Sequence, residues 1–207
     1  MTNTRRATVG VAAVIASGAA IVATSHADAA SKTNNFQMHR SPGIVAAGCL
    51  PDAKAKVSVR NRGPVEEMKV HATGLPHRTD FDLFVIQVPN APFGVSWYQG
   101  DLETDQHGVA NGTFVGRFNE ETFAIAPGTA PAPSVHSSPI PDATSNPAFG
   151  PVHTFHLGLW FNSPEDAVKA GCPGATTPFN GEHNAGVQVL NTDQFGDRHG
   201  PLRRLKP

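Results

Sequence analysis

The feature that most constrains the fold is the stretch from residue 65 to residue 118, in which strand patterns are separated by turn signals. Gly74-Leu75-Pro76 lies between one pair of strand patterns, and Asp105-Gln106-His107-Gly108 lies between a second pair. Short apolar runs separated by turns rich in Gly, Pro and Asp are typical of hairpins and corners in β proteins. The sequence therefore predicts an all-β fold, in the form of an antiparallel β-sandwich.

The expected strands differ in how their apolar residues are spaced. From residue 53 to residue 60, Ala and Val alternate with Lys, Ser and Arg, and Met68, Val70 and Ala72 continue this period of two. Successive side chains on a strand point to opposite faces, so we expect these strands to have one buried and one solvated face. Residues 81–88 are apolar on both faces, which predicts a central strand covered on both sides.

The C-terminal part of the chain adds one more strand pattern and a short helix. Residues 153–161 are expected to form a strand whose core face carries Phe155, Leu157, Leu159 and Phe161. The opposite face would carry Thr154, His156 and Trp160. Ser163 is a suitable N-cap, Pro164 suits the first helical position, and Gly171 ends the helix. The expected sandwich therefore contains one short helix.

A proline-rich stretch from residue 126 to residue 151 interrupts the strand patterns. Proline has no backbone N–H and is confined to edges and bulges of sheets, so this stretch predicts a long irregular loop. A linker between two domains is the alternative, but the segment that follows is too short to bury a core of its own.

The N-terminus has the pattern of an export signal. Arg5 and Arg6 precede an apolar run over residues 9–22, and Ala27-Asp28-Ala29 is a small-x-small cleavage pattern. A membrane anchor is the alternative, although the run is shorter than the roughly 20 residues of a span. We expect a secreted protein, by the general or the twin-arginine route, with a signal peptide (1–29), a flexible arm (30–48), one β-sandwich domain (49–196) and a frayed tail (197–207).

The two cysteines are expected to pair. Cys49 and Cys172 both lie in the part of the chain that would be exported, where disulfides persist. Two free buried thiols are the alternative, and a metal site is disfavoured because no C-x-x-C pattern is present.

The charge composition limits the expected partners. The formal net charge is −1 and only 16% of residues are charged. No basic footprint for nucleic acid or for an anionic membrane is present, so we expect neither as a partner once the signal is removed.

Two segments resemble known exported β domains. Residues 73–85, which begin with Thr73-Gly74-Leu75-Pro76, resemble the corner of fibronectin type III and bacterial immunoglobulin-like sandwiches, in which such a turn precedes an aromatic-led strand. Residues 101–108 are similar to Thr-Asp-x-x-Gly hairpins of exported bacterial β domains. Phe81 stands where those modules usually have Tyr. The chain also looks like uncharacterised exported proteins of actinobacteria. The resemblance implies an immunoglobulin-like fold and no particular function.

Histidines near the C-terminal strands are candidate metal ligands. His153, His156 and His183, with Glu182, could hold a divalent metal if the last two strands pair, because histidine is the commonest transition-metal ligand. The alternative is a set of surface or hydrogen-bonded structural histidines, since residues three apart on a strand point to opposite faces.

Three further sets of residues have both a functional and a simpler structural interpretation. Asp101, Glu103, Asp105 and His107 recur at every second position and could bind calcium, or could form the solvated face of a hairpin. Trp97, Tyr98 and Trp160 could form an aromatic platform for glycans or peptides, or belong to the core and its edge. Ser96 lacks the Gly-x-Ser-x-Gly pattern of a nucleophile elbow.

These observations favour a secreted, non-enzymatic binding or structural module, whose partner is an extracellular ligand or a cell-wall component. The alternative is a metal-dependent extracellular enzyme that uses His153, His156 and His183. No catalytic residue and no cofactor-binding loop is identified, and a divalent metal is the one cofactor under consideration.

Overall fold

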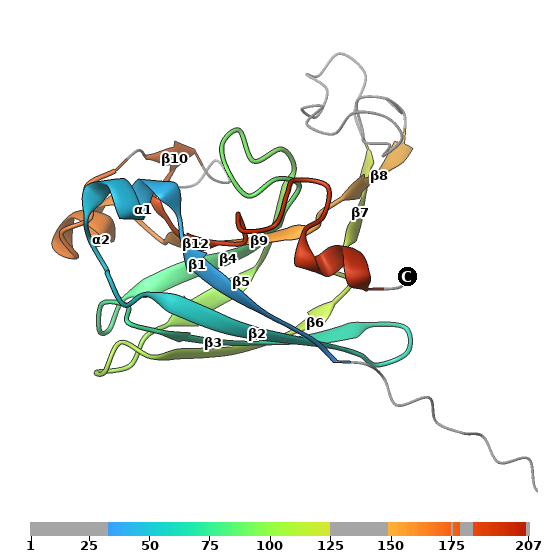
Figure 1. Ribbon diagram of the computed structural model, residues 1–207, viewed down its shortest axis with the longest axis horizontal. Helices are drawn as coiled ribbons and strands as arrows, with labels where there is room; N and C mark the ends of the chain where they lie inside the picture. Colours follow the sequence, from blue (N-terminus) through green and yellow to red (C-terminus); the bar gives the residue numbers. More distant parts are fainter. Residues whose placement is uncertain (1–32, 125–148, 175, 179–183, 206–207) are drawn as a thin grey trace, which may run out of the picture. The chain divides into compact units, whose positions relative to one another are not determined.

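Eight strands form one antiparallel sheet in the order β5-β4-β9-β12-β1-β2-β3-β6 (Figure 1). The computed structural model describes residues 33–124, 149–174, 176–178 and 184–205. The strands of the sheet are β1 (Asn34–Arg40), β2 (Lys54–Asn61), β3 (Glu66–Thr73), β4 (Asp80–Ile86), β5 (Ser96–Glu103), β6 (Ala110–Gly116), β9 (His156–Phe161) and β12 (Gln188–Asn191).

Two short hairpins and three helical segments accompany the sheet. The hairpins pair β7 (Glu120–Ala124) with β8 (Phe149–His153), and β10 (Thr177–Pro178) with β11 (Asn184–Ala185). The helical segments are α1 (Pro42–Ala47), α2 (Pro164–Lys169) and the 3-10 helix η1 (Pro201–Arg204). None of the helices in the described ranges is long and apolar enough to cross a membrane.

The sheet curls until its two end strands lie beside each other. A Cβ atom built on Gly100 of β5 would lie 2.9 Å from Phe114 Cε1 of β6, and one built on Gly112 of β6 would lie 2.6 Å from Leu102 Cδ2 of β5. Glycine at both positions therefore permits the close approach. The predicted all-β antiparallel fold is confirmed, in a form closer to a barrel than to two clearly separate sheets.

The inner face of this curled sheet holds the main hydrophobic core. Val57 and Val59 of β2 and Met68 and Val70 of β3 are buried in it, while the residues between them are more exposed, as their alternation predicts. The strand predicted to be covered on both faces is β4, in which every residue after Asp80 is buried.

Strand β9 is also buried on both faces. Leu157, Leu159 and Phe161 belong to the main core, as predicted, and Trp160 lies on the other side in a second cluster with Phe84. Phe155, predicted on the same face as the leucines, precedes the strand and is buried without belonging to the main core cluster. His156 is likewise fully buried. The outer face of β9 is therefore covered by protein rather than by solvent.

The expected flexible arm over residues 30–48 is wrong from residue 34 onward. Residues 34–40 form β1, which pairs with β2 and β12, and Met38 is fully buried opposite Ala55. Ser41 Oγ then accepts a hydrogen bond from Ile44 N at the start of α1, so the protein contains more than the one short helix expected. The pattern was missed because Phe36 and Met38 are the only large apolar residues of this strand.

The expected frayed tail over residues 197–207 is wrong as well. Leu202 is fully buried and its N–H donates to Phe155 O at 3.1 Å, and Leu205 is 9% exposed. These two leucines anchor η1 on the core, which a basic and seemingly solvated sequence does not suggest. Of the Pro-rich stretch, residues 126–148 lie outside the described residues, whereas residues 149–151 belong to β8. The expected signal peptide also lies outside them.

The disulfide and the helix cap are confirmed. Cys49 and Cys172 are bonded, with a Cα–Cα distance of 5.6 Å, so the turn after α1 is joined to the turn after α2. Ser163 caps α2, because its Oγ accepts from Asp166 N at 3.1 Å, and Pro164 is the first helical residue.

Candidate functional site

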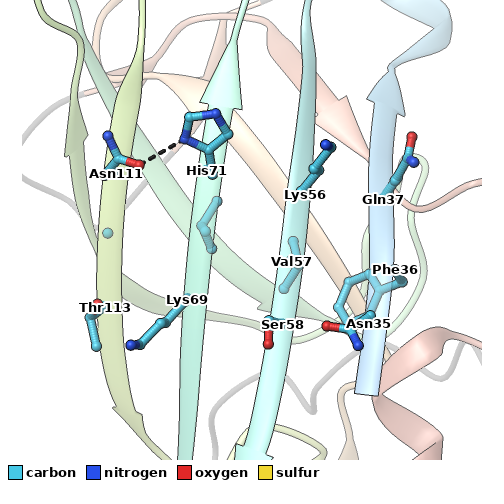
Figure 2. Close-up of a pocket in the computed structure, with 12 residues that line it drawn as sticks. Asn35, Phe36, Gln37, Lys56, Val57, Ser58, Lys69, His71, Asn111 and Thr113 are labelled. Atoms are coloured by element: carbon cyan, nitrogen blue, oxygen red, sulfur yellow. Dashed lines mark hydrogen bonds between the residues drawn. The ribbon is translucent and has the colours of Figure 1, made fainter. Parts of the chain in front are cut away.

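The outer side of β1, β2, β3 and β6 carries polar side chains in two cross-strand rows (Figure 2). The first row runs Gln37, Lys56, His71 and Asn111, and the second runs Asn35, Ser58, Lys69 and Thr113. We call the surface formed by these eight residues the polar face. Each row takes one residue from each of four adjacent strands.

The hydrophobic pattern of the strands creates this arrangement. Phe36, Val57 and Val70 lie between the two rows in sequence, and their side chains pack with the core. Because the side-chain period of a strand is two, their neighbours on either side must point outward. Antiparallel pairing then aligns Lys56 opposite His71 and Ser58 opposite Lys69.

The polar face forms a shallow hollow of about 670 Å³. His71 Nδ1 lies 2.8 Å from Asn111 Oδ1, so these two side chains hold each other at one end of the first row. Amides and hydroxyls both donate and accept hydrogen bonds, while the lysine ammonium groups only donate. The face therefore offers a dense set of hydrogen-bonding groups to an extended ligand.

Cationic groups dominate the charge on this side of β2 and β3. Lys54, Lys56 and Arg60 alternate with the buried residues of β2, and Lys69 lies on β3. Glu67 is the carboxylate on the same side of β3, and Arg62 Nη2 lies 2.9 Å from its Oε1. The Arg62 hydrogen bond lowers the pKa of Glu67, so this carboxylate is ionised and paired.

The outer side of β4 and β5 has the opposite charge. Asp82 lies opposite Asp101, and Asp80 lies opposite Glu103 in the next outward-facing row, which defines a carboxyl cluster of four residues. Tyr98 Oη donates to Asp101 Oδ1 at 2.5 Å. Like charges directly opposite each other on a sheet repel, so this cluster is an unfavourable local feature unless a proton is shared.

The pKa of Asp82 indicates that the four carboxyl groups need not all be charged at once. Asp82 is only 2% exposed, and its burial, followed by repulsion from Asp101, raises its pKa to about 7. Burial and the hydrogen bond to Asp101 also raise the pKa of Tyr98. Near neutral pH the Asp82 carboxyl is thus partly protonated and able to donate to Asp101.

The histidines predicted as metal ligands do not form a site within the described residues. His156 is fully buried, with Nδ1 2.9 Å from Thr192 Oγ1 and Nε2 3.0 Å from Asp197 O. A carbonyl oxygen only accepts, so Nε2 carries a proton and Nδ1 is occupied by the threonine hydroxyl. His153 stacks on Phe155 instead, with ring centroids 5.1 Å apart. His183 and Glu182 lie outside the described residues.

The predicted calcium stripe also separates into different environments. Asp101 and Glu103 belong to the carboxyl cluster, whereas Asp105 Oδ1 accepts from His107 N at 2.8 Å and from Val109 N at 3.0 Å. These backbone hydrogen bonds lower the pKa of Asp105 and identify it as a turn residue. No group of three His, Cys, Asp or Glu residues that could hold a metal ion occurs in the part of the chain that the structure describes.

The predicted aromatic platform is not assembled. Trp97 and Tyr98 are 48% and 45% exposed, but Trp160 is 3% exposed and lies in the second cluster. Tyr98 contacts Phe84 and Phe84 contacts Trp160, with ring centroids 5.6 and 5.4 Å apart. Ser96 lines a smaller hollow of about 300 Å³ beside Phe84 and Trp160.

The polar face was not identified from the sequence. The outward residues of β2 and β3 follow from their alternation, but β1 was not expected to be a strand, and the rows depend on which strands are neighbours. Neither the family models nor the curated proteins with which the chain was compared give a match. The geometry of the chain itself is therefore the basis for its functional assignment.

Proposed function

We propose that this protein is an exported, non-enzymatic binding module that presents its polar face to an extended, hydroxyl-rich ligand such as a cell-wall polymer. The observation that carries this proposal is the pair of aligned polar rows across four strands. Neighbouring strands are about 4.8 Å apart, so an extended ligand on this face lies within reach of hydrogen-bonding groups from all four strands.

The covalent structure supports an extracellular location. The Cys49–Cys172 disulfide is of the kind that persists in oxidising compartments, and the sequence before residue 30 has the pattern of an export signal. A rigid sheet also suits a binding role, because the side chains of the polar face are positioned by the packed core beneath them.

The metal-dependent enzyme is the weaker candidate for this chain. Its central ligand, His156, uses both ring nitrogens in hydrogen bonds to Thr192 and Asp197. His156 would have to give up one of these two hydrogen bonds to bind a metal, whereas the polar face needs no rearrangement to accept a ligand.

The test is co-sedimentation of the purified protein with insoluble cell-wall polysaccharide. A His71→Ala/Asn111→Ala variant removes the hydrogen-bonded pair at the end of the first row, and we expect it to reduce the bound fraction at least fivefold. The control is Gln106→Ala/His107→Ala, which removes another exposed histidine–amide pair, 3.2 Å apart in the turn between β5 and β6. Equal binding by both variants, or no binding by the wild type, would contradict the proposal.

A further inference from the structure

We propose that the ligand of the polar face is an anionic polysaccharide, one that carries carboxylate or phosphate groups at intervals along an extended chain. This inference rests on the proposed function, because it names the ligand class of the same surface. It is carried by the distribution of charge over that surface and by the kind of neutral groups that lie between the charges.

The cationic side chains follow the direction of one strand. Lys56 of the polar face is followed in both directions along β2 by further exposed cations, Lys54 and Arg60, which extend the face, and residues 54 and 60 lie about 20 Å apart at the usual strand rise. Lys69 stands on the adjacent strand, directly opposite Ser58. A line of cations of this length fits a polymer with repeated negative charges better than it fits a single small anion.

The ammonium groups of Lys54 and Lys56 are available for an external anion. Within the described part of the chain, neither Lys54 nor Lys56 has an ion-pair partner, and Glu67 is shared between Arg62 at 2.9 Å and Lys69 at 3.8 Å. The cationic groups therefore outnumber the carboxylates beside them. Four of the 16 Lys and Arg residues of the sequence lie on this side of two adjacent strands.

The neutral groups of the face match sugar hydroxyls. Asn35, Gln37, Asn111, Ser58 and Thr113 supply amides and hydroxyls in the same two rows as Lys56 and Lys69. Hydroxyl groups need partners that both donate and accept, which amides and hydroxyls provide. The combination of such groups with a line of cations is the recognition chemistry of a charged glycan.

Other polyanions fit the face less well. Proteins that bind single-stranded nucleic acid stack bases on aromatic side chains. Of the two aromatic rings that line this hollow, Phe36 packs against the core and His71 is paired with Asn111. Binding to an anionic membrane is stabilised by apolar residues that enter the lipid. Val115 is the large exposed apolar side chain of β6 on this side, and a single valine gives little stabilisation of this kind.

The experiment measures the affinity of the purified protein for alginate, a polymer of uronic acids, and for dextran, a neutral glucose polymer of the same length. A single-stranded oligothymidylate and vesicles that contain phosphatidylglycerol serve as competing polyanions. Measurements at low and at high NaCl concentration report the electrostatic part of the affinity, because salt screens exposed charges. Circular dichroism confirms that each variant is folded.

We expect wild-type protein to bind alginate at least tenfold more tightly than dextran, oligothymidylate or the vesicles, and to lose that preference at high salt. Lys56→Gln/Lys69→Gln should weaken alginate binding at least tenfold at low salt. The control Lys169→Gln/Arg204→Gln changes the net charge equally at exposed positions of α2 and η1, and should change the affinity less than twofold.

Three other results would reject the anionic charge of the ligand, its polysaccharide nature, or the proposed function itself. Equal binding of alginate and dextran, unaffected by salt or by the lysine substitutions, would reject the anionic ligand and leave the proposed function intact. Tighter binding to oligothymidylate or to vesicles would reject a polysaccharide as the ligand class. Failure to bind any of the polymers would overturn both this inference and the proposed function.

Discussion

The two outer sides of the curled sheet differ in how far they are covered. On β2 and β3, buried residues alternate with more exposed ones, and the outward side chains form the polar face. On β4, β9 and β12 nearly every residue is buried, because other parts of the chain lie over their outer side. One side is therefore free to bind a ligand, while the other contributes to stability.

Several contacts explain how the outer side of β4, β9 and β12 is covered. Phe93, from the loop after β4, packs against Trp160 with ring centroids 5.1 Å apart. Gln188 Nε2 and Asn191 Nδ2 both donate to Pro89 O, at 3.1 and 3.0 Å. The cover is thus a combination of aromatic packing and buried hydrogen bonds, and polar residues beneath it are structural.

The largest effect is expected from the disulfide, which joins the segment between β1 and β2 to the segment after β9. Its two cysteines are 123 residues apart, so loop-entropy models predict a stabilisation of about 4–5 kcal/mol through restriction of the unfolded chain. A Cys49→Ala/Cys172→Ala variant should lose a free energy of unfolding of this size in urea titrations. A loss below about 1 kcal/mol would show that the two joined segments contribute their stability without the disulfide.

Substitutions in β9 should have the next largest effect and should be severe on both of its faces. Leu157→Ala is expected to lower the free energy of unfolding by about 2–5 kcal/mol, because it leaves a cavity in the main core. His156→Ala should lower it by about 2–4 kcal/mol, because Thr192 and Asp197 lose a buried partner. Urea titrations with and without a chelator measure both. A chelator effect on wild type equal to the His156→Ala loss would instead indicate a bound metal.

The protonation of Asp82, on the outer side of β4, should make the free energy of unfolding depend on pH. Its pKa is about 7 in the folded protein against an ordinary value of 3.8, so between these pH values the folded state retains a proton that the unfolded state releases. The contribution of Asp82 to the free energy of unfolding should therefore be largest below about pH 4 and decrease toward pH 7, by at most about 4 kcal/mol.

The variant Asp82→Asn isolates this contribution, since an amide donates to Asp101 at every pH. The difference in unfolding free energy between the variant and the wild type should increase from pH 4 to pH 8. Tyr98 is the only tyrosine of the chain, so its NMR signals report the change at Asp101 directly. Parallel pH profiles for the two proteins would contradict the shared proton.

The smallest effects are expected on the polar face. Gln37→Ala and Lys56→Gln should each change the free energy of unfolding by less than about 0.5 kcal/mol, because both side chains are exposed and neither fills the core. Urea titrations of these two variants and of Leu157→Ala compare the loss of unfolding free energy on the polar face with that in the core. A loss above about 1.5 kcal/mol for either variant would assign the face a structural role.

The sequence was informative where the hydrophobic spacing within one strand determines the burial of that strand. The alternation of Ala55, Val57 and Val59 with Lys, Ser and Arg predicted β2 correctly, and the apolar residues on both faces of residues 81–88 predicted that β4 is covered on both sides. In both cases the hydrophobic spacing of a short segment determines the burial of that segment, so no knowledge of its neighbours is needed.

The polar face and the role of His156 depend on contacts between distant segments. Asn35 reaches its row only because β1 pairs with β2, and Thr113 reaches it only because β6 pairs with β3. His156 is buried because residues near Thr192 and Asp197 pass over it. Local spacing predicts which side of a strand a residue occupies, but not which segment covers that side.

The most direct test of the account is an NMR titration of the purified, isotope-labelled protein with alginate. The account predicts that backbone amide shifts change mainly at residues 35–37, 56–58, 69–71 and 111–113, which line the hollow of the polar face. Amides of β4 and β9 should remain unchanged. Shift changes concentrated around Trp97, Tyr98 and the loop after β4, with none on the polar face, would contradict the central claim.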